Sequence, residues 1–150
     1  GIAQNTQQQA DFDEMLDGLL SHTVKEVKAK ALLNRKDVIY LDAREKKEYD
    51  VSHIPNAKWI GYDTFKKKNV ANLPKDKMIV VYCSVGYRSE KIAEKLEKMG
   101  FTNVANLYGG IFDWKHAGGS VLNSKEEETE KIHTFNKSWS QWLFQGIKVF

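Results

Sequence analysis

Residues 78–89 read MIVVYCSVGYRS. The first five are apolar and mostly β-branched and predict a buried strand, and the only cysteine of the chain, Cys83, follows directly. A helical pattern begins near Ser89. Backbone N–H groups converge in such a strand-to-helix turn, and the helix start adds partial positive charge, so an anion at the sulfur is favoured. The stretch therefore predicts a reactive thiolate at the end of a strand.

Arg88 lies five positions after the cysteine. Its guanidinium is a permanent cation with a fork of N–H donors, which suits an anionic substrate bound through two hydrogen bonds. The loop has no lysine and no second arginine, so a dianion would meet only Arg88 and the loop amides. A buried structural cysteine is the alternative, because free cysteine is among the most buried residue types. The strand, Gly86 and Arg88 together favour the reactive interpretation.

The composition limits the kinds of site that the chain can form. Its 150 residues are enough for one domain with a core of its own. One cysteine cannot form an internal disulfide, and the histidines lack the close spacing of zinc ligands. We therefore expect no metal and no cofactor.

The charges are mixed along the chain, with 23 Lys and Arg against 20 Asp and Glu. A net charge of +3 is too weak for a nucleic-acid-binding stripe, so we expect no nucleic-acid partner. The apolar runs are shorter than the roughly 18 residues that cross a membrane, so we expect no membrane span. The chain begins with Gly1 and not Met, which leaves two compartments open: the cytoplasm, or the periplasm after removal of a signal peptide.

Residues 1–22 are predicted as a tail and one helix. Gln4–Gln9 is polar and of low complexity and is expected to fray. From Asp11 onward apolar residues recur at helical spacing, namely Phe12, Met15, Leu16, Leu19 and Leu20. Thr23-Val24-Lys25-Glu26 has the pattern of a capping box and predicts a second helix that runs to about Asn34.

Beyond residue 34, short apolar runs alternate with helical patterns. The predicted strands are Val38–Leu41, Ala57–Ile60, Met78–Tyr82 and Asn103–Leu107. The predicted helices lie near Tyr62–Lys67, over Ser89–Met99 with Gly100 as its C-cap, and after Gly109-Gly110. This alternation predicts a parallel sheet with helices on both faces. Asp42 and Cys83 each follow a strand, so we expect them at the same sheet edge, where such sheets bind ligands.

The C-terminal residues 123–150 are predicted as a charged linker and an amphipathic helix. The linker is Lys125–Lys131, and the apolar residues that recur at steps of three and four are Ile132, Phe135, Trp139, Trp142 and Leu143. We expect this apolar stripe to pack on the domain. A surface that binds a partner is the alternative, since large apolar patches are rarely left exposed.

Several segments together resemble a rhodanese-like (sulfurtransferase) domain. In chain order they are Leu41-Asp42-Ala43-Arg44 with Glu48-Tyr49, Ser52-His53-Ile54-Pro55-Asn56-Ala57, Cys83–Ser89, and Gly109-Gly110-Ile111 through Trp114 to Gly118 and Val121. Their order and spacing make the resemblance specific. It covers residues 23–122 and implies an α/β fold with a central five-stranded parallel sheet and helices on both faces, to which this chain adds N- and C-terminal helices.

The resemblance also implies an activity. Cys83 would take a sulfane sulfur from thiosulfate or another sulfane donor as a persulfide. It would pass this sulfur to a thiophilic acceptor such as cyanide, a thiol or a partner protein. The substrate would contact the loop residues Ser84, Val85, Gly86, Tyr87, Arg88 and Ser89. Asp42 and Arg44 would support the strand end through hydrogen bonds and an ion pair, and His53 would make local structural hydrogen bonds.

Two other classes of protein fit parts of the pattern. Cysteine phosphatases of related fold also use a cysteine loop that ends in arginine, but they place one more residue between the two than the four found here. One residue adds up to about 3.5 Å of span, and the shorter loop favours a single sulfur atom over a phosphoryl group. A binding module that keeps the scaffold and uses its apolar C-terminus for a partner is the third reading.

Overall fold

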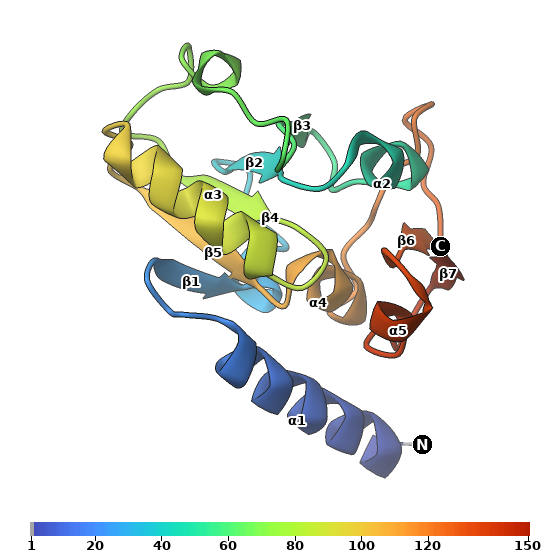
Figure 1. The fold of residues 1–150 in the computed structure, drawn as a ribbon. Helices are drawn as coiled ribbons and strands as arrows, with labels where there is room; N and C mark the ends of the chain where they lie inside the picture. Colours follow the sequence, from blue (N-terminus) through green and yellow to red (C-terminus); the bar gives the residue numbers. More distant parts are fainter. Residues whose placement is uncertain (1) are drawn as a thin grey trace.

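A five-stranded parallel sheet forms the centre of the molecule (Figure 1). The computed structural model describes residues 2–150, and their side chains from residue 6 onward. The sheet has the order β1-β5-β4-β2-β3. Its strands are β1 (Lys25–Lys28), β2 (Ile39–Asp42), β3 (Lys58–Trp59), β4 (Ile79–Tyr82) and β5 (Val104–Tyr108). The α/β class and the parallel sheet predicted from the sequence are confirmed.

Helices connect the strands and extend both ends of the chain. They are α1 (Ile2–Leu19), α2 (Lys46–Val51), α3 (Tyr87–Lys98), α4 (Gly110–His116) and α5 (Lys137–Ser140), with 3₁₀ turns η1 (Ala29–Ala31) and η2 (Lys67–Asn69). A separate pair of short parallel strands, β6 (Lys131–His133) and β7 (Ile147–Val149), lies near the C-terminus. Within residues 2–150, no helix combines the length and apolar character needed to cross a membrane.

The sheet is covered on both faces, as β4 requires, since all four of its residues are buried. On one face, Ile79 and Val81 share a core cluster with Ile92 and Leu96 of α3. On the other face, Val80 and Tyr82 share a second cluster with residues of α1, α4 and the C-terminal segment, among them Phe12, Leu16, Phe112 and Ile132. In Figure 1, α3 and α1 accordingly lie on opposite sides of the sheet.

The strand register brings the two predicted strand-end residues to one edge. Asp42, the last residue of β2, pairs with Tyr82, the last residue of β4. Cys83 follows Tyr82, so its loop leaves the sheet beside Asp42. The edge formed by these carboxyl ends is where ligands bind in open α/β sheets.

The predicted helix over Thr23–Asn34 is wrong. Lys25–Lys28 forms the edge strand β1, which pairs with β5. The two groups of the apparent capping box have other partners: Thr23 Oγ1 donates to Glu94 (2.8 Å), and the Glu26 carboxylate lies 2.9 Å from Nδ1 of His22. Pairing along the sheet edge therefore overrides the local helix signal.

Two other boundaries differ from the prediction. Gln4–Gln9, expected to fray, is part of α1, where Gln7 and Gln9 donate to carboxylates four residues on, at 2.8 and 3.0 Å. Residues 62–67, predicted as a short helix, contain a bend and a turn at 62–64, and the 3₁₀ turn η2 begins at Lys67.

The predicted amphipathic helix from Ile132 to Leu143 is also wrong, because this segment forms β6 and the short helix α5. Phe135 has a φ of +74°, which an α-helix does not contain. Asn136 caps α5 by accepting a hydrogen bond from the backbone N–H of Trp139 (2.9 Å). Most of the apolar stripe nevertheless packs on the core: Ile132 and Leu143 are buried, and the two tryptophans are partly buried against it.

Candidate active site

Cys83 lies between the carboxyl end of β4 and the first turn of α3. Its Sγ accepts a hydrogen bond from the backbone N–H of Gly86 (3.1 Å) and lies 3.4 Å from Oγ of Ser89. The side chain is almost entirely buried, yet it lines a cavity. The N–H group and the helix terminus bring partial positive charge to the sulfur, as the sequence pattern predicts.

A buried asparagine of β5, Asn106, holds the Cys83 loop through hydrogen bonds to Gly86 and Ser89. Gly86 has a φ of +128°, which favours glycine, and its carbonyl accepts a hydrogen bond from Nδ2 of Asn106 (3.0 Å). Ser89 Oγ donates to Oδ1 of the same Asn106 (2.6 Å). A hydroxyl has one hydrogen, so Ser89 can donate to Asn106 or to the Cys83 sulfur, but not to both at once. Strand β5 thereby positions both neighbours of the sulfur.

The start of α4 holds the other side of the loop. Ile111 N–H donates to the carbonyl of Cys83 (3.0 Å), and Phe112 N–H donates to that of Ser84 (3.2 Å). A Cβ at Gly110, whose φ is +59°, would lie 2.3 Å from the Ser84 carbonyl oxygen. Only glycine allows this close approach, which explains Gly110, the second residue of the Gly109-Gly110 pair.

Arg88 forms a two-pronged ion pair with Glu48 of α2. Its NH1 donates to Oε2 (2.9 Å) and its NH2 to Oε1 (3.1 Å), and NH2 also donates to Ser84 Oγ (3.0 Å). The Glu48 side chain is fully buried, and Arg88 is 16% exposed. The fork that the sequence suggested for an anionic substrate is therefore occupied by a carboxylate of the chain itself.

Both partners of this pair are charged at neutral pH. Burial raises the pKa of the Glu48 carboxyl, but the hydrogen bond and charge of Arg88 outweigh it and lower the pKa overall. Desolvation lowers the pKa of Arg88, whereas the hydrogen bond to Glu48 and the charge of Cys83 raise it, with a net rise. The pair thus carries no net charge into the site.

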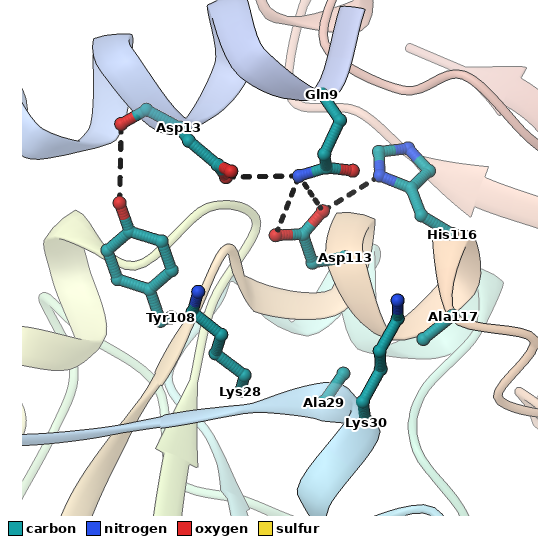
Figure 2. Close-up of a pocket in the computed structure, with 9 residues that line it drawn as sticks. All are labelled: Gln9, Asp13, Lys28, Ala29, Lys30, Tyr108, Asp113, His116 and Ala117. Carbon is teal, nitrogen blue, oxygen red and sulfur yellow. Dashed lines mark hydrogen bonds and ion pairs between the residues drawn. The ribbon is translucent and has the colours of Figure 1, made fainter. Parts of the chain in front are cut away.

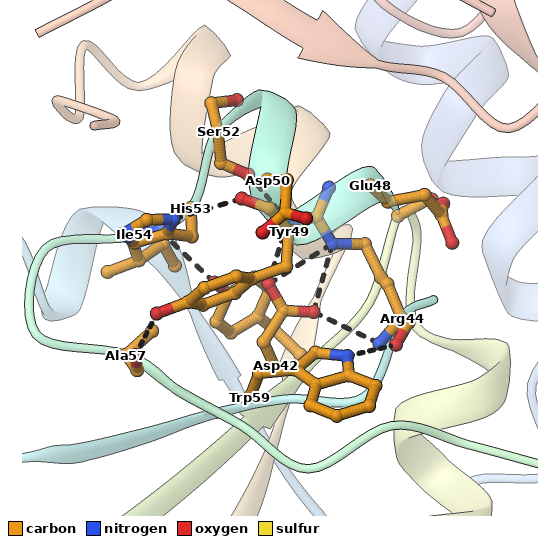
Figure 3. Close-up of polar contacts among 12 residues, drawn as sticks. Asp42, Arg44, Glu48, Tyr49, Asp50, Ser52, His53, Ile54, Ala57 and Trp59 are labelled. Atoms are coloured by element: carbon orange, nitrogen blue, oxygen red, sulfur yellow. Dashed lines mark hydrogen bonds and ion pairs between the residues drawn. The ribbon is translucent and has the colours of Figure 1, made fainter. Parts of the chain in front are cut away.

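Asp42 and Arg44 form a second buried ion pair (Figure 3), and Asp42 pairs with Tyr82, the residue before Cys83. Arg44 donates from Nε to Oδ1 (3.0 Å) and from NH2 to Oδ2 (2.7 Å) of Asp42, and NH2 also donates to the carbonyl of Ser52 (2.7 Å). The Arg44 carbonyl accepts from Trp59 Nε1 (2.8 Å). Neither charged residue lines the cavity at Cys83, so their position suits the supporting role.

His53 makes local contacts in the same region (Figure 3). Its Nδ1 lies 3.0 Å from the carbonyl of Tyr49, and the two rings stack with their centroids 4.0 Å apart. It does not line the cavity at Cys83. The geometry gives His53 a structural task at the end of α2.

The cavity at Cys83 has a volume of about 290 Å³. Its lining residues are Leu19, Cys83, Ser84, Val85, Tyr87, Arg88, Phe135 and Trp139. The structure thus brings four of the predicted substrate-binding residues, Ser84, Val85, Tyr87 and Arg88, to one cavity, while Gly86 and Ser89 lie behind the sulfur as its hydrogen-bond partners. Leu19 and the two C-terminal aromatic residues complete the walls.

A second cavity, of about 330 Å³, lies between α1, β1 and α4 and shares no residue with the first (Figure 2). Gln9 of α1 donates to Asp113 of α4 (3.2 Å), and Asp113 lies 2.9 Å from Nδ1 of His116. The Tyr108 hydroxyl lies 2.7 Å from Oδ1 of Asp17 and 3.3 Å from the backbone carbonyl oxygen of Asp13, both in α1. These contacts attach α1 to the domain. Within residues 2–150, no group of three or more His, Cys, Asp or Glu side chains is placed to hold a metal ion.

Two residues of the site, Glu48 and Asn106, are not predicted from the sequence as functional residues. Glu48 is part of the family motif, but nothing local marks it as the partner of Arg88, which is 40 positions away. Asn106 carried a usable signal: a polar residue inside an apolar strand that is buried on both faces needs a partner.

The comparison with known families agrees with this geometry. The family model of the rhodanese-like domain matches residues 25–117, which is more than half of the chain. The chain therefore belongs to the rhodanese-like domain family.

Individual relatives show what this chain resembles. The rhodanese-related protein from Thermoplasma volcanium is 31% identical with a TM-score of 0.60, and the match covers 65% of this chain and 97% of the other chain. The thiosulfate sulfurtransferase from Pseudomonas aeruginosa is 27% identical with a TM-score of 0.58, and the match covers 67% of this chain and 20% of the other chain. The tRNA uridine(34) hydroxylase from Enterobacter sp. (strain 638) is 33% identical over 96 residues, which is 61% of this chain and 28% of the relative. The chain thus spans about a quarter of the length of the curated relatives it matches.

Proposed function

We propose that this protein is a sulfurtransferase that carries sulfane sulfur on Cys83. The observation that supports it best is the position of Sγ, which lines a cavity at the carboxyl edge of the sheet and accepts a hydrogen bond from Gly86 N–H at 3.1 Å. The same donor, with the helix terminus behind it, suits a negatively charged terminal sulfur as well as a thiolate.

The reaction has two steps. The Cys83 thiolate attacks the outer sulfur of a sulfane donor; with thiosulfate, the S–S bond of the donor breaks, a new S–S bond forms to Cys83, and sulfite leaves with the electron pair of the broken bond. A thiophilic acceptor then attacks the terminal sulfur of the persulfide. With cyanide, thiocyanate leaves and the Cys83 thiolate is regenerated, whereas a thiol or a partner protein would become the next persulfide.

The curated relatives are named tRNA uridine(34) hydroxylases, but this chain covers only about a quarter of their length. We propose for this chain the step that its own cysteine can perform, which is loading and passing on sulfur. The physiological acceptor then decides in which larger reaction the sulfur is used.

Mass spectrometry of the intact protein tests the proposal. After incubation with sulfane donors, the wild type is expected to gain the mass of one sulfur atom, and Cys83→Ser is expected to gain none. Circular dichroism of Cys83→Ser provides the control, because serine is close in size and leaves the loop hydrogen bonds in place. Sulfur transfer by Cys83→Ser at the wild-type rate would contradict the persulfide mechanism.

The phosphatase alternative is tested on the same preparation. The four residues between Cys83 and Arg88 leave little room for the oxygens of a phosphoryl group, and no acidic residue in the loop can protonate its leaving group. We expect no hydrolysis of aryl phosphates above background. Phosphate release that Cys83→Ser abolishes would place the protein among the cysteine phosphatases instead.

A further inference from the structure

The cavity at Cys83 has apolar walls that come from outside the family match. Leu19 is the last residue of α1, and Phe135 and Trp139 belong to the C-terminal segment, whereas the match covers residues 25–117. These three residues and the Cys83 loop line one cavity, which has a volume of about 290 Å³. Two additions to the domain, one at each end of the chain, therefore shape the space in which a sulfur donor must bind.

The position of Phe135 is not explained by core packing. Its side chain is 43% exposed, whereas its neighbour Ile132 is fully buried. Its backbone has a φ of +74°, a conformation that costs a non-glycine residue energy. The N–H of Phe135 donates to Nδ1 of His133 (3.0 Å), which holds the strained turn. A strained backbone that keeps an exposed aromatic ring at a cavity is typical of a binding residue.

The charges at the cavity do not favour a dianion. Among the lining residues that the structure describes, Arg88 alone has a permanently charged side chain, and Glu48 neutralises it. The Phe135 ring lies 5.3 Å from the Arg88 guanidinium, on which it makes a cation–π contact. A dianion would also meet the negative charge of the Cys83 thiolate itself. By contrast, an apolar group finds Leu19, Phe135 and Trp139.

We propose that Leu19, Phe135 and Trp139 select sulfane donors that carry an apolar substituent and at most one negative charge. This inference rests on the proposed sulfur-carrier function of Cys83 and names its donor class. The substituent lies against the three apolar side chains, while the transferable sulfur points at Sγ. Burying apolar surface on both partners makes such a donor bind more tightly than an inorganic one.

Thiosulfonates are suitable probes because they differ from thiosulfate in one substituent. In the expected step, the Cys83 thiolate attacks the outer sulfur of R–SO₂–S⁻, the bond between the two donor sulfurs breaks, and R–SO₂⁻ leaves with its electron pair. Cys83 becomes a persulfide, and no other reactant is needed. Methanethiosulfonate and benzenethiosulfonate carry the same charge and differ only in the apolar group R.

The experiment measures sulfur loading of Cys83 by intact-mass spectrometry with thiosulfate, methanethiosulfonate and benzenethiosulfonate. The variants are Phe135→Ala and Trp139→Ala, with Phe150→Ala as the matched control. Phe150 is also an exposed phenylalanine, 62% exposed, and does not line the cavity. Differences in intrinsic donor reactivity cancel, because each donor is compared between variants.

We compare between proteins the ratio of loading efficiencies, benzenethiosulfonate over methanethiosulfonate, and expect it to be roughly tenfold higher in the wild type than in the cavity variants, as burial of a phenyl group allows. The loss in Phe135→Ala and Trp139→Ala should fall mainly on benzenethiosulfonate, because its phenyl group is the part that these side chains would bury. Phe150→Ala should keep the wild-type ratio. A ratio that neither cavity variant lowers overturns the inference while leaving the sulfur-carrier function intact.

Binding to Cys83→Ser separates the two proposals, because no sulfur can be transferred there. Calorimetric titration should show tighter binding of benzenethiosulfonate than of methanethiosulfonate, and the added change Phe135→Ala should remove the difference. If no donor loads the wild type, the sulfur-carrier function fails, and this titration still tests selection by the cavity. Equal affinities of the two thiosulfonates overturn it.

Discussion

Arg88 donates both prongs of its guanidinium to Glu48, at 2.9 and 3.1 Å, directly beside the cysteine that we propose to carry sulfur. The carboxylate is fully buried and has its pKa lowered by the arginine, so it stays charged at neutral pH. An anionic donor can use the same guanidinium only by competing with Glu48. This competition can be measured, because each member of the pair can be replaced separately.

Glu48→Gln should improve the use of thiosulfate. The amide has no charge to hold Arg88, so part of the guanidinium becomes available, and we expect the KM for thiosulfate to fall roughly three- to tenfold. Steady-state kinetics with cyanide as acceptor give the comparison. Glu97→Gln, an exposed position on α3, is the control and should leave KM unchanged. An unchanged or higher KM in Glu48→Gln would show that Glu48 does not limit donor binding.

Arg88→Ala should weaken anionic donors more than it slows the reaction of a preformed persulfide. It should also destabilise the fold, because removing one partner of a buried ion pair costs about 3–5 kcal/mol. Urea unfolding measures this cost, and adding Glu48→Gln to Arg88→Ala should recover part of it by removing the unpaired charge. Arg88→Lys should restore donor binding only in part, since lysine lacks the planar fork. Identical donor kinetics in all of these variants would remove Arg88 from the donor site.

Asn106→Ala should slow sulfur loading, although Asn106 makes no hydrogen bond to the sulfur itself. The change removes the donor to the Gly86 carbonyl and the acceptor of Ser89, so the loop loses the contacts that position its N–H and hydroxyl groups. Small displacements of catalytic groups cost large factors, and we expect loading to slow roughly 10- to 100-fold. Asn103→Ala, just before β5, is the matched control. Loading at the wild-type rate in Asn106→Ala would show that Gly86 and Ser89 hold their positions unaided.

Stability should fall on mild acidification because of His133. Burial lowers its pKa from the usual 6.5, and its neutral Nδ1 accepts the Phe135 N–H. Between the lowered folded pKa and 6.5, the unfolded state binds more protons, so stability is lost as the pH falls through this window and is fully present above it. Urea unfolding at successive pH values should show a shallower loss for His133→Gln. Both proteins keep His22, whose raised pKa acts in the opposite sense. Parallel curves for the two proteins would exclude His133 as the cause.

Removal of residues 131–150 should lower the melting temperature. Ile132 is fully buried and Leu143 is 2% exposed, and losing side chains of this kind costs about 2–5 kcal/mol each. Differential scanning calorimetry of the truncated chain measures the effect. A truncated protein that melts unchanged but no longer binds a partner would support the alternative in which this segment is an interaction surface.

The sheet and the sulfur loop could be predicted because their signals are local. Buried parallel strands consist of apolar residues throughout, and Met78–Tyr82 leads directly to Cys83 and Gly86, whose backbone angle demands glycine. Position 110 likewise requires glycine, since a Cβ there would collide with the loop carbonyls, and the sequence shows this requirement directly. Each of these features depends on a few consecutive residues.

Some errors occur where distant segments decide the structure. Thr23 and Glu26 match a helix cap, but their side chains contact Glu94 and His22 once β5 offers an edge to pair with. The pairing of Arg88 with Glu48 is of this kind too, because the two residues are 40 positions apart and no local pattern records the contact. The error near the C-terminus is different, because its signal is local: Asn136 is a good N-cap residue and starts a new helix in the middle of the predicted one.

The hydrogen bonds from α4 to the carbonyls of Cys83 and Ser84 limit how far the backbone of the loop can move when a sulfur atom is added to Cys83. The loop lies between the starts of two helices, and a shift of its backbone would break these bonds and the contact at Gly110. In the proposed persulfide, the added sulfur atom would therefore extend into the cavity and take up part of its volume. A donor would reach the empty cavity, whereas an acceptor would reach a cavity that the added sulfur has partly filled. The two proposed half-reactions would thus have different size limits, although the backbone is the same in both.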